Sequence, residues 1–96
     1  MDFLHIDRDG GKVFYLGYHL ELSKREFTIL ARIAEKSDEV LGTRELYEEL
    51  FAGEKEMILK NITVHIFNIN RKAREIGGRT LIEFSRAGGY KISDTL

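Results

Sequence analysis

The most regular hydrophobic pattern of the chain lies between residues 59 and 76. Apolar residues recur there in steps of three and four, which places them on one side of an α-helix. Gly77 and Gly78 follow at once and predict the end of this helix, because glycine readily adopts the left-handed conformation found at helix C-termini. The predicted buried stripe consists of Leu59, Ile62, Ile66, Ile69, Ala73 and Ile76.

A first helix is predicted from about residue 24 to residue 36. Ser23 and Glu26 have the spacing of a capping box, in which each side chain accepts a hydrogen bond from the other residue's backbone N–H. Apolar residues at helical spacing follow from Phe27 onward, and Ser37-Asp38 is expected to end the helix.

A second, shorter helix is predicted to open at Thr43, with Glu45 in the first turn, where the helix dipole favours an anion. Residues 52–56 are predicted to form a loop between the second and third helices. The apolar face of the second helix would consist of Leu46, Tyr47, Leu50 and Phe51.

Strands are predicted at both ends of the chain. Segments 3–7, 12–16 and 18–22 are separated by glycine-bearing turns, and segments 81–84 and 90–92 form a closing hairpin around residues 85–89. The order predicts one α+β domain over residues 1–96, with an N-terminal antiparallel sheet (1–22), a helical core (23–78) and a C-terminal hairpin (79–93). Its core is predicted to include Phe27, Leu30, Leu46, Leu50, Ile62, Ile66 and Ile69.

Composition narrows the class of protein. With 96 residues, 43% of them apolar, the chain can build one hydrophobic core but no large multidomain enzyme. The absence of cysteine excludes disulfides, thiolate zinc sites and cysteine nucleophiles. The sequence has no signal-peptide pattern and no apolar run of about 18–20 residues, so a soluble, cytoplasmic protein without a membrane partner is expected.

The charge is divided unevenly along the chain. Residues 1–59 carry thirteen Asp/Glu against eight Lys/Arg, whereas residues 60–96 carry seven Lys/Arg against three Asp/Glu. A basic end on a chain of net charge −1 is typical of a polyanion-binding surface, although a scatter of charges over solvated faces is the alternative.

The third helix is predicted to carry unusual chemistry opposite its buried stripe. Amide, methyl, imidazole and cationic groups lie there, and these are the groups that contact base edges and phosphates. In the alternative interpretation, Val64 and Phe67 pack against a neighbouring element. On a helical wheel Asn61, Val64, Asn68 and Arg71 face outward, flanked by Lys60, His65, Phe67 and Lys72.

A short helix, a long helix and a hairpin with a basic tip make up the winged form of the helix-turn-helix. Four segments of the sequence resemble the DNA-binding output domain of OmpR/PhoB-type response regulators. They are Leu22-Ser23-Lys24-Arg25-Glu26-Phe27-Thr28-Ile29-Leu30, Thr43-Arg44-Glu45-Leu46 with Leu50-Phe51, Asn61-Ile62-Thr63-Val64-His65-Ile66, and Arg86-Ala87-Gly88-Gly89-Tyr90. The resemblance covers residues from about 3 to 93.

This resemblance implies a transcriptional regulator that uses no cofactor and binds double-stranded DNA. It implies a four-stranded N-terminal sheet, a recognition helix in the major groove and a wing arginine in the minor groove. It also implies pairing as a homodimer on repeated half-sites, and contact of RNA polymerase with residues 53–57, which otherwise form an ordinary acidic loop. The expected DNA-binding residues are Lys60, Asn61, Val64, His65, Asn68, Asn70, Arg71, Lys72, Arg86 and Tyr90.

Two other classes of function compete with DNA binding. An enzyme is disfavoured, because the three histidines have no ligand spacing, and no nucleophile elbow or phosphate-binding loop is present. The stronger alternative is a winged-helix module that binds a protein partner, with weak DNA binding or none. An exposed Phe67 on a helix with few cations favours that alternative. The two would differ in salt dependence, since only DNA binding weakens steeply as salt rises.

Overall fold

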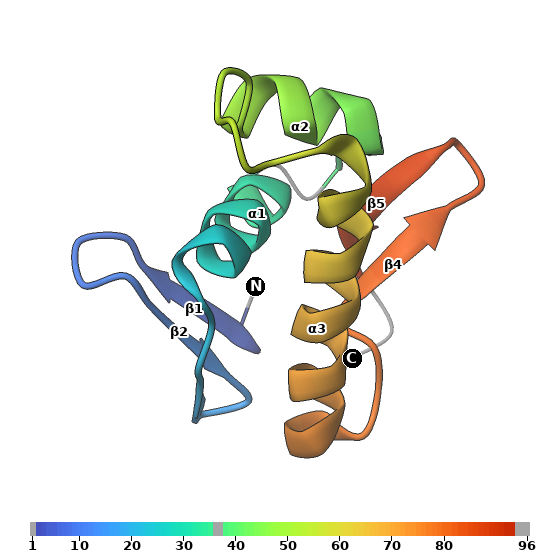
Figure 1. The fold of residues 1–96 in the computed structure, drawn as a ribbon. Helices are drawn as coiled ribbons and strands as arrows, with labels where there is room; N and C mark the ends of the chain where they lie inside the picture. The colour runs from blue at the N-terminus through green and yellow to red at the C-terminus, as the bar shows by residue number, and fades with distance from the viewer. Residues whose placement is uncertain (1, 36–37, 94–96) are drawn as a thin grey trace.

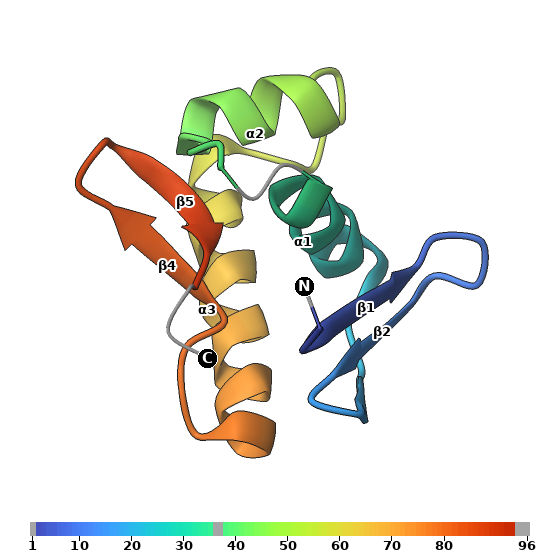
Figure 2. The same ribbon diagram turned by 180° about the vertical axis from the view of Figure 1, so that it is seen from behind.

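Three helices lie between two antiparallel sheets in the computed structural model, which describes residues 2–35 and 38–93 (Figures 1 and 2). The elements follow the predicted order, and their ends differ from the predictions by one or two residues. The predicted end of the first helix at residues 36 and 37 lies outside the described residues. The elements are β1 (Leu4–Asp7), β2 (Lys12–Tyr15), β3 (Tyr18–Leu20), α1 (Lys24–Glu35), α2 (Thr43–Leu50), α3 (Leu59–Gly77), β4 (Ile82–Ser85) and β5 (Gly89–Ile92).

The N-terminal sheet has three described strands, in the order β1-β2-β3. Leu4 pairs with Tyr15, and Val13 pairs with Leu20, so the two-residue period of the strands directs all four side chains into the core. The expectation of a fourth strand is wrong for the described residues. After Leu20 the chain runs directly into the capped start of α1, which leaves no room there for another strand.

The capping box at the start of α1 is confirmed. The Ser23 N–H donates to Glu26 Oε1 over 3.0 Å, and the Glu26 N–H donates to Ser23 Oγ over 3.2 Å. At the other end of the helical region, Gly78 ends α3 in the left-handed conformation (φ 75°), and its N–H donates to the Arg74 carbonyl. The first cap fixes where α1 begins, and the second fixes where α3 ends.

The core lies where α1, α2 and α3 meet the two sheets. Leu30, Leu46, Ile62, Ile66 and Ile69 are buried as predicted, whereas Phe27 and Leu50 are only partly buried at its edge. The two sheets also contribute side chains to the core, which the spacing of apolar residues in the helices does not indicate. Other buried core residues are Leu4, Val13, Tyr15, Leu20, Ile29, Ile33, Leu41, Phe51, Met57, Ala73, Leu81, Ile82 and Ile92.

The hairpin formed by β4 and β5 is attached to the helical region through the segment before α2. Leu41 and Tyr90 exchange two backbone hydrogen bonds of 3.0 and 2.8 Å. The neighbouring Gly89 permits this close approach, since a Cβ there would lie 2.5 Å from Val40 Cγ1. The hairpin is thereby held beside α3 on the side away from the N-terminal sheet (Figure 2).

Candidate nucleic-acid interface

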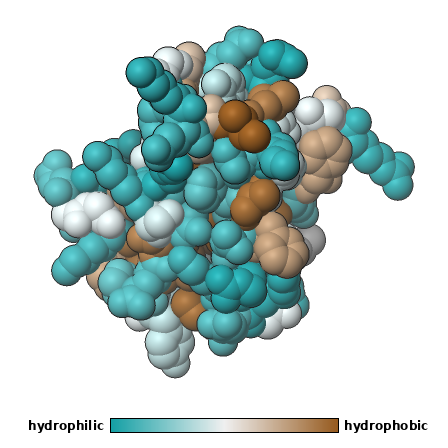
Figure 3. All heavy atoms as spheres, in the orientation of Figure 1, coloured by the Kyte–Doolittle hydropathy of each residue, from teal (hydrophilic) through white to brown (hydrophobic). Residues whose placement is uncertain are grey.

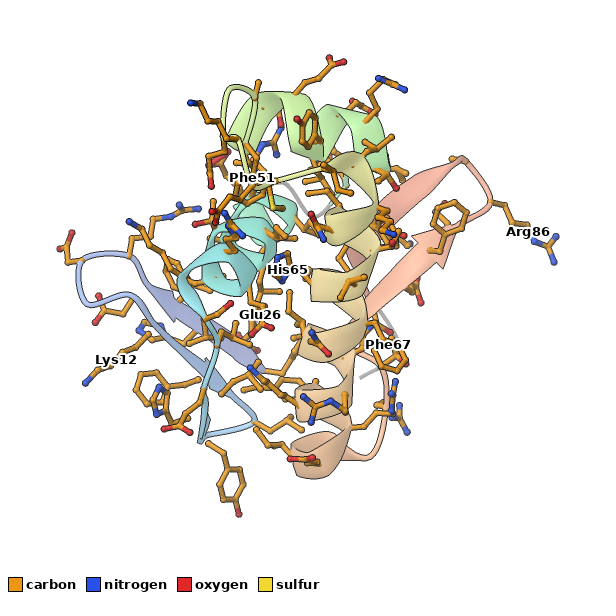
Figure 4. All side chains as sticks on the ribbon, viewed as in Figure 1. Lys12, Glu26, Phe51, His65, Phe67 and Arg86 are labelled. Carbon is orange, nitrogen blue, oxygen red and sulfur yellow. The ribbon has the colours of Figure 1, made fainter. Side chains whose placement is uncertain are left out.

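The outer face of α3 is open to solvent. Val64 is 49% exposed and Phe67 is 61% exposed, so the alternative in which they pack against a neighbouring element does not hold. Figure 4 shows Phe67 on the side of α3 opposite His65. We call this surface the outer face of α3; its exposed residues are Lys60, Thr63, Val64, Phe67, Arg71, Arg74 and Glu75.

Asn61 takes part in the N-terminal cap of α3. Its Oδ1 accepts a hydrogen bond of 2.9 Å from the Ile58 N–H, which has no helical partner at this position. The side chain is half-buried, at the flank of the outer face. Its oxygen is therefore engaged within the protein, although the residue lies close to the surface predicted to contact DNA.

Asn70 holds α3 to the first strand of the hairpin. Its Oδ1 accepts from the N–H groups of Leu81 and Ile82 over 3.1 and 2.8 Å, and its Nδ2 donates to the Ile82 carbonyl over 2.9 Å. The Asn70 amide is therefore engaged within the protein, and its expected contact with DNA stays a prediction. The residue follows the buried Ile69 on the flank of α3 that meets β4, where unpaired backbone groups need partners.

Lys72 lies on the opposite flank of α3, towards α1. Its Nζ lies 2.7 Å from Oε1 of Glu26, a carboxylate that is only 5% exposed. Burial of Glu26 favours a higher pKa, but its hydrogen bonds from Lys72 and Ser23, together with the charges of Lys72 and His65, lower the pKa below its ordinary value. Lys72 therefore neutralises a carboxylate inside the protein, and its predicted contact with DNA stays a prediction.

His65 also faces inward. It lies between α1 and α3 (Figure 4), is half-buried, and its buried Nδ1 has no hydrogen-bond partner among the described residues. Its place on the helix explains this orientation, because residues 65 and 72 are seven positions apart and so share one flank. His65 is thus directed away from the outer face of α3, and its predicted contact with DNA stays a prediction.

The hairpin presents Arg86 at its tip. The side chain is exposed and extends away from the body of the protein (Figure 4). Glu83 lies opposite Lys91 in the strand register and forms an ion pair of 3.5 Å with it, so Glu83 is engaged with a residue other than Arg86. The Arg86 guanidinium is therefore presented to solvent beyond the outer face of α3.

Tyr90 and Asn68 lie at the margins of this surface. The Tyr90 ring is half-buried and meets the Phe84 ring edge-on, with 5.2 Å between the ring centroids, while Phe84 itself is 65% exposed. Asn68 is half-buried on the α1 side of the outer face. The sequence interpretation missed three exposed members of the face, Thr63, Arg74 and Glu75. The helical wheel carries a signal for Arg74, which lies three residues after Arg71.

Within residues 2–35 and 38–93, no helix is both long enough and apolar enough to cross a membrane. The same part of the chain contains no group of three or more His, Asp or Glu residues arranged to hold a metal ion.

A family model described as transcriptional regulatory protein, C terminal, matches residues 17–92. The chain belongs to this family. It is 30% identical over 89 residues to the response regulator protein PmrA of Pseudomonas aeruginosa, covering 93% of this chain and 38% of that protein. The family is one of transcriptional regulatory domains, and the winged helix-turn-helix predicted from the sequence is confirmed.

Solved structures of response regulators share this fold. DrrB of Thermotoga maritima, an OmpR/PhoB homologue, is 27% identical, with a TM-score of 0.77 over 95% of this chain and 42% of that one. The RstA DNA-binding domain of Klebsiella pneumoniae, in complex with the RstA box, is 22% identical, with a TM-score of 0.75 over 95% of this chain and 91% of that domain. The chain spans about 40% of the length of the curated relatives it matches. These similarities confirm the resemblance to OmpR/PhoB-type output domains.

Proposed function

We propose that this chain is the sequence-specific DNA-binding output domain of a two-component response regulator. In this proposal α3 enters the major groove, which is wide enough to admit an α-helix, and Arg86 enters the adjacent minor groove. The observation that carries the proposal is the exposed outer face of α3, with its cations, beside an exposed arginine at the tip of the hairpin. The RstA domain, which has this fold, is bound to a DNA element.

The roles within this interface follow from charge and exposure. Lys60, Arg71 and Arg74 on α3 and Arg86 on the hairpin are exposed cations, and they are assigned to the phosphates and the minor groove. Val64 and Asn68 are assigned to base edges, while Asn61 and Tyr90 border the contact. The flanks of α3 are assigned a supporting role within the protein, through His65 and Lys72 on the side of α1 and Asn70 on the side of β4.

Further partners belong to the same proposal. The relatives are response regulators more than twice as long as this chain, so control by a phosphorylated receiver domain is proposed for the full-length protein. A homodimer on repeated half-sites and contact between residues 53–57 and RNA polymerase are also proposed. Glu54 in that loop forms a 2.9 Å ion pair with Arg25, whereas Lys55 and Glu56 are exposed. A cytoplasmic location is also proposed, because a regulator of this kind has to reach chromosomal DNA.

The experiment is selection from a random duplex library at low salt, followed by affinity measurements at increasing salt. The slope to measure is that of the logarithm of the binding constant against the logarithm of the salt concentration, to which each neutralised phosphate contributes about −0.9. Four such contacts, from Lys60, Arg71, Arg74 and Arg86, predict a slope of about −3 to −4. The double variant Lys60→Ala/Arg71→Ala is expected to reduce the slope by about 2. Lys12→Ala is the matched control, since Lys12 is an exposed cation on the N-terminal hairpin, away from α3 (Figure 4).

The second candidate function is a winged-helix module that binds a protein partner. The exposure of Phe67 and Phe84 favours it, because large exposed apolar side chains often mark protein contacts. A folded protein that enriches no duplex from the library at low salt would contradict the DNA-binding proposal and support this one. Enrichment of one motif in two copies would support both DNA binding and pairing on half-sites.

A further inference from the structure

The centre of the outer face of α3 is apolar. Val64 and Phe67 are adjacent on this face, because residues three positions apart lie on the same side of a helix. Figure 3 shows apolar groups along this exposed side of α3, surrounded by hydrophilic ones. We call Val64 and Phe67 the apolar pair. A helix of the usual rise separates them by about 4.5 Å along its axis.

The amides that could read bases near this pair are partly committed elsewhere. Recognition of adenine by asparagine uses both the oxygen and the nitrogen of the amide. The Asn61 oxygen caps α3, and three hydrogen bonds join the Asn70 amide to residues 81 and 82. If these two residues formed hydrogen bonds with bases, the N-terminal cap of α3 or the contact between α3 and β4 would be lost. The remaining amide, that of Asn68, lies at the margin of the outer face, so the groups at its centre are the two apolar side chains.

The surroundings of the apolar pair are cationic. Lys60, Arg71 and Arg74 lie exposed on the same face, and Arg71 is 3.8 Å from Glu75 in a solvent-exposed ion pair. A partner that complements this surface must present negative charge around a small apolar group. The major groove of DNA has this combination where thymine exposes its C5-methyl group between two rows of phosphates.

We propose, on the basis of the DNA-binding function above, that Val64 and Phe67 read the C5-methyl groups of thymines. Successive nucleotides of one strand are about 3.4 Å apart, so the axial separation of the pair matches one to two base steps. The preferred duplex then carries thymines at neighbouring positions under the middle of α3. Val64 and Phe67 act as residues that determine specificity, and the surrounding cations supply affinity for any sequence.

The test removes the methyl groups and nothing else. In the duplex that the library selection favours, each thymidine is replaced in turn by deoxyuridine, which keeps Watson–Crick pairing. For the parent protein, binding is expected to weaken about fourfold at each contacted position (about 0.8 kcal/mol). Phe67→Ala and Val64→Ala are expected to lower affinity for the thymidine duplex and to lose most of this discrimination at one position each. Both side chains are exposed, so these variants should unfold at the same temperature as the parent.

Tyr18→Ala is the matched control, because Tyr18 is an exposed aromatic (67%) on β3 rather than on α3. It should keep both affinity and discrimination. Equal binding of thymidine and deoxyuridine duplexes by the parent, or unchanged discrimination in both α3 variants, would overturn the inference while leaving DNA binding intact. Failure of the folded parent to bind any duplex at low salt would overturn the proposed function and this inference with it.

Discussion

Two neighbouring cations on α3 are used in different ways. Lys72 Nζ lies 2.7 Å from Glu26 Oε1, and the Glu26 side chain is 6% exposed, whereas Arg71 Nη1 lies 3.8 Å from Glu75 in a pair whose side chains are 51% and 71% exposed. One residue along a helix turns the side chain by about 100°, which separates the flank facing α1 from the outer face. The same kind of charge therefore supports the protein at one position and remains available to a ligand at the next.

The difference lies in solvation. A charge pair that is open to water contributes about 0–1 kcal/mol and is screened by salt, so Arg71 can exchange Glu75 for a phosphate at little cost. A buried carboxylate that loses its cation must bear the cost of desolvation. We therefore expect changes on the inner flanks of α3 to alter stability, and changes on the outer face or hairpin tip to alter binding.

The largest effect on folding is expected for Ile66→Ala. Ile66 is 4% exposed on the buried side of α3, and truncation of such a residue leaves a cavity. The variant should lose about 2–5 kcal/mol of unfolding free energy, measured by urea denaturation. Val64→Ala, two residues earlier on the outer face, should lose less than about 0.5 kcal/mol. Losses of similar size would show that the buried stripe is not the main support of α3.

A smaller loss is expected for Asn70→Ala. The substitution leaves the Leu81 and Ile82 N–H groups without their partner, which should cost about 2–3 kcal/mol in thermal or urea unfolding. Asn68→Ala is the control, because it removes a half-buried amide that is not part of the contact between α3 and β4. If the folded Asn70→Ala variant discriminated poorly between bases while keeping full stability, Asn70 would belong to the outer face after all.

The Glu26–Lys72 contact predicts a dependence on pH. Because the pKa of Glu26 is below its ordinary value of 4.5 in the folded state, its stabilising effect is complete above that pH and is lost as the pH falls through the lowered pKa. At neutral pH, Glu26→Gln should lower the unfolding free energy by about 1–2 kcal/mol. This difference should shrink when urea denaturation is repeated below pH 4.5. A difference that stayed constant with pH would mean that the carboxylate charge has no part in the contact.

The smallest effect on folding, with a clear effect on binding, is expected for Arg86→Ala. The exposed side chain should leave the melting temperature unchanged, while the loss of a cation from the hairpin tip should weaken DNA binding and reduce the preference for A·T-rich flanks. Arg86→Lys should restore only part of the affinity, because lysine lacks the planar guanidinium. If Arg86→Ala bound duplexes with every flanking sequence as tightly as the parent protein does, the hairpin would have no part in DNA recognition.

Local patterns along the chain were sufficient for much of the fold. The spacing of apolar residues predicts α3 from Leu59 and its end at the paired glycines, and the capping box predicts the start of α1. Each of these signals involves residues within a few positions of one another. The same helical period places Val64 and Phe67 opposite the buried stripe, and the turn between two strands predicts an exposed Arg86.

The sequence by itself determined the order of the elements and the buried stripe of α3, because helix geometry relates these residues through short separations. That no described element covers the apolar pair was decided by the tertiary structure. Only the tertiary structure decided that Asn70 binds residues 81 and 82, that Lys72 meets Glu26, and that His65 faces α1. These residues lie on the flanks of α3, between its buried and outer sides. Whether a flank is solvated or buried depends on which distant segment packs against it, and the spacing of residues along one helix does not indicate which segment that is.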